Sequence, residues 1–216
     1  MAKSRGAGLD SGARAGRAVE LAFGSGVPSL LSRPTLIHYG TVALPPGAVH
    51  DAEVTDSAIV AAAIRELWQT AKFTTKDVVL GVGNQRVVVR DLEVPWLPMT
   101  QLRASLPFQV QDMLPLSADE ALLDYYPTGE FAGPSGRTLQ GLLVAATRDT
   151  VRNNVIAAES AGLRPQVVDL NAFALLRAMA RGEVAEQTAA LVDVGAQVTN
   201  VVIAAHGVPR FARAIA

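Results

Sequence analysis

Cysteine is absent from the sequence, and histidine occurs only three times. A chain without cysteine forms neither disulfides nor thiol-based active sites, and it fits a reducing compartment. The three histidines, His38, His50 and His206, are widely separated along the chain. Without cysteine to complete a ligand set, this spacing argues against a zinc site.

An excess of charge of one sign is also missing, as is any long apolar run. Formal net charge is −1, with lysine and arginine spread along the chain, which argues against a nucleic-acid-binding surface. No run approaches the ~18 apolar residues that span a bilayer, and the basic start MAKSRGAGLDSG lacks the apolar segment of a signal peptide. Half of the 216 residues are hydrophobic, which is enough for a substantial core. These features predict a soluble, cytoplasmic protein.

The first 86 residues are predicted to form a β-meander followed by a helix and a strand. Apolar residues recur at helical spacing in the helix, and Asp56 is a suitable N-cap for it. The expected elements are a hairpin at 7–23, a Gly/Pro/Ser-rich loop at 24–34, a third strand at 35–44, the helix at 56–71 and a strand at 77–82.

The middle of the chain, residues 87–162, is predicted to be an inserted α+β subdomain. Its expected elements are a strand at 87–94, a helix at 99–113 that Pro107 should kink, strands at 121–126 and 139–146 around a loop at 129–137, and a helix at 148–161. In the last helix, Val151, Val155 and Ile156 are expected to face inward.

The end of the chain returns to meander character. A strand at 166–170 is followed by a short helix that Asn171 can cap, and residues 189–215 form strand, turn, strand, turn and strand. The predicted units are therefore 1–86, 87–162, 163–187 and 188–216. Because no helix follows the second meander to cover its sheet, we expect the chain to be truncated.

An Asp-x-Gly turn between two β-rich runs occurs twice, at Asp10 and at Asp193, 183 positions apart (193 − 10). Either turn alone is more simply read as an ordinary hairpin, because Asp and Gly favour turns for backbone reasons. A glycine turn can also bring backbone N–H groups close to phosphate oxygens, and a neighbouring aspartate can hold Mg²⁺ through water. Two such turns facing each other would bind phosphates from both sides. In the first turn Arg17 could add a positive charge. The second turn is better suited to phosphate binding because it has Gly195 and Thr199. The pair favours phosphate binding, although the Walker pattern is absent.

Short motifs along nearly the whole chain occur in the same order as in a known family. They include Leu44-Pro-Pro-Gly-Ala-Val49, Val94-Pro95, Met113-Leu-Pro115, Val144-Ala-Ala-Thr147, Ala161-Gly-Leu-Arg-Pro165, Leu191-Val-Asp-Val-Gly195 and Phe211-Ala-Arg213. Each motif is weak by itself, but the collinear set resembles the PilM family, the actin-like cytoplasmic proteins of type IV pilus assembly.

The resemblance implies an α/β fold of the actin-like (ribonuclease H-like) ATPase class, related to the cell-division protein FtsA, with residues 87–162 as an inserted subdomain. It implies a groove between the first unit and the insert that captures the cytoplasmic N-terminal peptide of the inner-membrane protein PilN. The protein would act as a scaffold, peripheral to the inner membrane through its partners, with at most weak ATPase activity. It also implies ATP in a cleft, with Mg²⁺ at Asp10 and Asp193. The implied nucleotide-binding positions are Asp10, Ser11, Gly12, Arg17, Asp193, Gly195, Ala196 and Thr199.

The sequence departs from the family pattern in two places. Ser11 stands where an apolar residue is usual, and Ala13 to Ala15 replace the Ser/Thr that follows the first glycine. The family also continues into a second half that completes the adenosine pocket. We therefore expect weak ATP binding or none, and tight binding of Mg-ATP in isothermal titration would contradict this. Two alternatives stay open, an FtsA-like division protein and an actin-fold small-molecule kinase.

Overall fold

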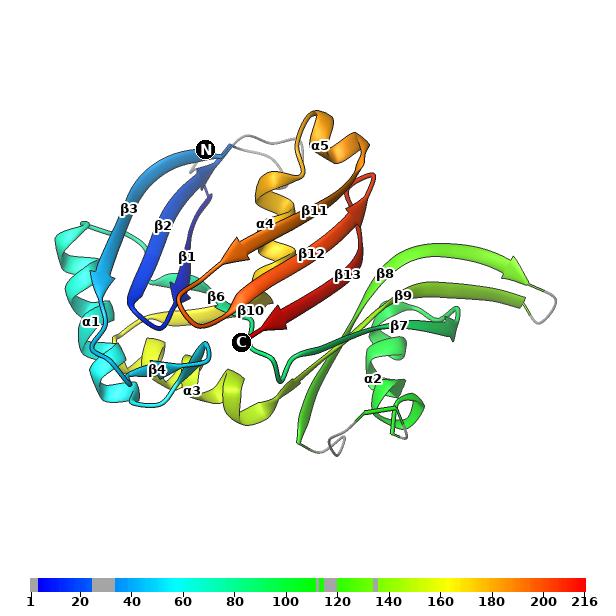
Figure 1. The fold of residues 1–216 in the computed structure, drawn as a ribbon, viewed down its shortest axis with the longest axis horizontal. Coiled ribbons are helices and arrows are strands. Elements are labelled where there is room, and N and C mark those ends of the chain that lie inside the picture. Colours follow the sequence, from blue (N-terminus) through cyan, green and yellow to red (C-terminus); the bar gives the residue numbers. More distant parts are fainter. Residues whose placement is uncertain (1–3, 25–33, 112, 115–119, 134–135) are drawn as a thin grey trace.

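The computed structural model describes residues 4–24, 34–111, 113–114, 120–133 and 136–216, so the expected loop at 24–34 lies almost entirely outside the described residues. A mixed five-stranded sheet has the strand order β10-β6-β1-β2-β3 (Figure 1). Its strands are β1 (Ser4–Ser11), β2 (Ala15–Phe23), β3 (Thr35–Ala43), β6 (Asp77–Val82) and β10 (Arg164–Leu170). The first three are antiparallel neighbours, and β6 and β10 run parallel to β1. The expected hairpin, third strand and buried strand are confirmed.

Helices α1 (Ser57–Thr70) and α3 (Arg148–Ser160) cover one face of this sheet and pack against each other. Helix α1 begins where expected, because the Asp56 carboxylate accepts hydrogen bonds from the N–H groups of Ala58 and Ile59, both at 3.0 Å. The core between helices and sheet includes Leu9, Val60, Ile64, Leu67, Val78, Leu80, Ala157 and Ala158. Between β3 and α1 lies a small hairpin of β4 (Val49–His50) and β5 (Glu53–Val54).

A separate antiparallel sheet follows β6, with the order β7-β9-β8. Its elements are β7 (Val88–Pro95), α2 (Met99–Gln109), β8 (Ala121–Gly133) and β9 (Gly136–Thr147). Leu102 and Leu106 of α2 are buried against Tyr125 and Leu143 of the sheet. The Tyr125 hydroxyl lies 3.0 Å from the Leu92 carbonyl oxygen, which fixes this aromatic side chain in the core.

Two expectations for this region are wrong. The loop at 129–137 is instead the distal part of one long hairpin, which extends away from the rest of the molecule in Figure 1. The hairpin continues because Arg137 pairs with Glu130 across the strands and stacks on Trp96, with its guanidinium carbon 4.6 Å from the ring centroid. Helix α2 ends at Gln109, two residues after Pro107, rather than at residue 113.

Helix α3 buries small and polar residues most deeply, whereas the expected Val151, Val155 and Ile156 are half-buried, and of these three Val155 packs against the core of the first sheet. Its buried residues are Thr150, Asn154, Ala157 and Ala158. Small side chains predominate there because α3 packs closely on α1. Since Ala157 and Ala158 belong to the core of the first sheet, we propose that the insert ends near Thr147 rather than at residue 162.

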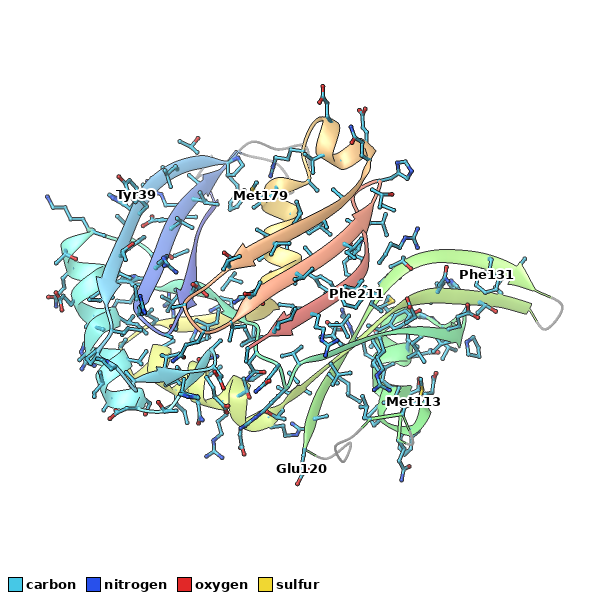
Figure 2. All side chains as sticks on the ribbon, viewed as in Figure 1. Tyr39, Met113, Glu120, Phe131, Met179 and Phe211 are labelled. Carbon is cyan, nitrogen blue, oxygen red and sulfur yellow. The ribbon has the colours of Figure 1, made fainter. Side chains whose placement is uncertain are left out.

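The last strands form a three-stranded antiparallel sheet in the order β11-β12-β13, as expected for a second meander. The elements of this part are α4 (Asn171–Met179), α5 (Glu183–Glu186), β11 (Thr188–Val194), β12 (Thr199–Ala205) and β13 (Val208–Ile215). Helix α4 packs on one face through Phe173 and Leu176. The other face exposes apolar side chains, including Phe211, which Figure 2 shows on β13. Within the described residues, no helix is long and apolar enough to cross a membrane.

Candidate functional site

The two Asp-x-Gly sequences form hairpins with the same register. Asp10 lies directly opposite Arg17 across β1 and β2, and Asp193 lies directly opposite Asn200 across β11 and β12. Each aspartate therefore faces the residue seven positions later (17 − 10 and 200 − 193). The resemblance between the two turns extends from the sequence to the backbone pairing.

Both turns are closed by the same type of hydrogen bond. In the first turn (residues 12–14) the Gly12 N–H donates to the Ala15 carbonyl at 3.1 Å, and in the second turn (residues 195–198) the Gly195 N–H donates to the Val198 carbonyl at 3.0 Å. A β-carbon on Gly195 would lie 2.5 Å from the Val198 carbonyl oxygen, so the second turn requires glycine. Since the two glycine N–H groups close their own turns, contacts to an anion would come from the other amides of each turn and from Arg17.

The two turns line one cavity of about 590 Å³, which we call the cleft. It brings together seven of the eight predicted positions, and only Thr199 is not among its lining residues. Thr199 begins β12, where it pairs with Val194 and Ile215. The seven that line it are Asp10, Ser11, Gly12, Arg17, Asp193, Gly195 and Ala196.

Charges on both sides of the cleft act on Asp10. Burial raises the pKa of the Asp10 carboxyl above its usual value, the Arg17 guanidinium 3.7 Å away lowers it, and the negative charge of Asp193 raises it again. The net pKa shift is upward. The two aspartates line the same cleft, so their negative charges face a common space.

Sequence reasoning missed two asparagines that shape the cleft. The Asn171 side chain, expected to cap α4, makes no cap and instead donates from Nδ2 to Asp10 Oδ1 at 3.4 Å. Asn200 is buried and also lines the cleft. Both pack on glycines of the β6 end: a β-carbon on Gly81 would lie 2.2 Å from Asn171 Oδ1, and one on Gly83 would lie 2.7 Å from Asn200 Oδ1. The Gly-x-Gly sequence at the end of a buried strand is the signal that could have indicated this close approach.

The donor set of the cleft fits a hard divalent cation bound partly through water. Carboxylate oxygens from Asp10 and Asp193 are a ligand type that Mg²⁺ prefers, and phosphates usually complete such sites. Among the described residues, no three acidic or histidine side chains come together to hold a metal on their own. A metal here would therefore depend on the anion it accompanies.

A second cavity, about 480 Å³, lies between the inserted sheet and the first sheet, and we call it the groove. One wall consists of six consecutive residues of β8, Leu122 to Pro127, with Val144 and Ala146 of β9. The opposite wall comes from β6, β10 and α4, and includes Val82, Val168 and Phe173. The groove lies between the first unit and the insert, the region in which the family resemblance implied a peptide groove.

The groove combines an apolar lining with charged pairs. Arg103 Nε lies 2.7 Å from Asp124 Oδ1 on one side, and Arg177 pairs with Asp169 on the other. The rings of Tyr126 and Phe173 are in contact across it, with centroids 5.2 Å apart. Among the residues that the structure describes, strand β8 has a hydrogen-bonded neighbour, β9, on one side only, so its other edge is available for pairing.

Comparison with known proteins gives a consistent result. The family model described as type IV pilus assembly protein PilM matches residues 8–215. A chain of a solved PilM–PilN type IV pilus biogenesis complex superposes with a TM-score of 0.82 at 28% identity, covering 97% of this chain and 61% of that one. The cytoplasmic domain of EpsL, an inner-membrane component of the type II secretion system of Vibrio cholerae, superposes with a TM-score of 0.59 at 14% identity, covering 98% and 71%, and shows a shared fold. The chain thus spans 61% of the length of the pilus relative.

Proposed function

The chain belongs to the PilM family of type IV pilus assembly proteins, and we propose that it is an actin-like scaffold that binds the N-terminal peptide of PilN in its groove. The actin-like fold and the role in pilus assembly follow from the family. The family match favours this function over an FtsA-like division protein or a small-molecule kinase. We propose further that the protein acts in the cytoplasm, held at the inner membrane by its partners.

The groove carries the proposal for the peptide. It is long, mostly apolar, and bordered by the open edge of β8, which could add an extended peptide as a further strand. Alternate side chains of such a peptide would face the apolar wall that includes Leu122, Tyr126 and Val144. Binding of this kind needs no catalytic residue, in agreement with a scaffold.

The cleft carries a separate proposal for ATP with Mg²⁺. The amides of the two turns and Arg17 would contact phosphate oxygens, and Asp10 and Asp193 would hold Mg²⁺ through water. The metal would neutralise charge between the phosphates and the two carboxylates. The cavity volume of about 590 Å³ lies within the usual range of small-ligand sites.

A labelled PilN N-terminal peptide and fluorescence anisotropy test the main proposal. Tyr126→Asp places a charge in the apolar wall and should weaken peptide binding by about tenfold or more, because an unpaired charge would have to be desolvated. Phe131→Asp is the matched control, since Phe131 is an exposed aromatic residue of the same strand and lies outside the groove, towards the far end of the hairpin (Figure 2). Equal losses in both variants, or no binding to the unmodified protein, would contradict the proposal.

A further inference from the structure

The β4–β5 hairpin contacts the cleft and the surroundings of the groove through three consecutive residues. The Asp51 N–H donates to Gln197 Oε1 in the second turn at 3.0 Å, and Ala52 lines the cleft. Glu53 contacts the two segments that lead into and out of the insert. Its Oε2 lies 3.1 Å from Arg86 Nη1, and its Oε1 accepts a hydrogen bond from the Thr150 hydroxyl at 3.3 Å.

The two partners of Glu53 are immediate neighbours of groove residues. Arg86 precedes Val87, and Thr150 precedes Val151, and both valines line the groove. Asn84 joins the two segments, because its Nδ2 donates to Thr150 Oγ1 at 3.4 Å and its Oδ1 accepts from the Arg86 N–H at 3.0 Å. A displacement of either groove wall at this end therefore reaches Glu53 through a direct contact.

The hairpin itself is suited to moving as one piece. Asp51 and Ala52 have positive φ angles of 49° and 58°, which non-glycine residues adopt only when their surroundings hold them there. The Glu53 side chain is only 16% exposed, so its ion pair is screened less than a surface pair. A short, constrained connection of this kind transmits a displacement instead of absorbing it.

We propose that the β4–β5 hairpin couples the two sites, so that a peptide in the groove changes the position of the second turn in the cleft. This inference rests on the proposed function, because it needs a groove that binds a peptide. Glu53 and Gln197 are the positioning residues at the two ends of the connection. By linkage, if the peptide changes the affinity of the second turn for a ligand by some factor, that ligand changes the affinity of the groove for the peptide by the same factor.

Amide hydrogen exchange on the full chain tests the coupling. Adding the PilN N-terminal peptide should change the exchange rates of the Asp51 amide and of residues 195–198 by about fivefold or more, the lower end of couplings seen in proteins. Glu53→Ala should abolish this distant change while the peptide still binds. Gln197→Ala, at an exposed position, should abolish the response of residues 195–198, because it removes the contact between the hairpin and the second turn. Glu130→Ala is the matched control, because it also removes an ion-paired glutamate, but at the far end of the insert.

The outcomes separate the two proposals. If the peptide does not bind to the unmodified protein, both the proposed function and the coupling are overturned. If it binds and the exchange of residues 195–198 is unchanged, or changes equally in Glu53→Ala and Glu130→Ala, the coupling alone is overturned. If Glu53→Ala does not fold, Gln197→Ala decides, since an unchanged response of residues 195–198 in that variant contradicts the connection.

Discussion

Gly81 lies on β6 beneath Asn171. Because glycine has no β-carbon, the Asn171 side chain can pack directly on the β6 backbone, where its amide nitrogen lies 3.4 Å from the Asp10 carboxylate. The sequence predicted a turn just after Asp10 and the start of a helix at Asn171, since both assignments use local preferences. It gave no indication that they would touch, because they are 161 positions apart and meet only when β1, β6 and β10 pair.

Replacing Gly81 with alanine should disturb the cleft. The new methyl group would lie 2.2 Å from Asn171 Oδ1, so Asn171 must move, and we expect a loss of about 1–3 kcal/mol in the free energy of unfolding. Urea denaturation measures this loss. Gly6→Ala is the control, since a β-carbon there has no atom within 4 Å. Similar stabilities of the two variants would show that the packing of Gly81 against Asn171 is unimportant.

The strands and helices were largely predictable, and the errors have physical causes. The helix at 57–70 and the meanders follow from short-range periodicity, which needs no tertiary information. The β8–β9 hairpin was underestimated because Gly129, Gly133 and Gly136 read as loop residues, while the cross-strand pair Glu130–Arg137 and the Trp96 contact support strand pairing there. In α3, Thr150, Asn154, Ala157 and Ala158 are the most deeply buried residues because the helix packs on α1, whereas the sequence placed this helix in the insert.

Glu20 ties β2 to the connection between α1 and β6. Its side chain is fully buried and accepts hydrogen bonds from the N–H group of Thr74, at 2.7 Å, and from the Thr74 hydroxyl. Burial alone would raise the pKa of Glu20, but the hydrogen bonds from Thr74 outweigh it and leave this pKa below its ordinary value of 4.5. A carboxyl with a lowered pKa in the folded state adds stability above pH 4.5, and this stability is lost as the pH falls through the lowered value.

We expect Glu20→Gln to lower the free energy of unfolding at pH 7 by about 1–3 kcal/mol, because the donors of Thr74 lose a buried charged acceptor. The variant should also lose part of the decline in stability that the unmodified protein shows below pH 4.5. Urea unfolding between pH 3 and pH 7 measures both effects. Glu66→Gln, an exposed position on α1, serves as the reference. Parallel pH profiles for all three proteins would rule out this role of Glu20.

The complete fold places two sites that local sequence patterns could indicate only in outline. The cleft was predicted from a repeated turn, and the structure brings those turns to one cavity, but the contributions of Asn171, Asn200 and Ala52 depend on long-range packing. The groove was predicted only from the family resemblance and without residues, because its walls come from seven separate strands and helices around the insert boundary. The apolar outer face of β11–β13, with Val192, Val194 and Phe211 exposed, agrees with the expectation of an uncovered sheet.

Backbone amide chemical shifts of the isotope-labelled protein, followed during titration with Mg-ATP, test whether the two turns act as one phosphate-binding site. This measurement tolerates weak binding, which we expect for this sequence. The signals of residues 12–15 and of residues 195–198 should shift together and give one dissociation constant, because both turns line the same cleft. In Asp193→Asn the shifts of both turns should change, since Asp193 acts on Asp10 across the cleft. Shifts confined to one turn, or the absence of shifts in both at millimolar Mg-ATP, would contradict the shared site.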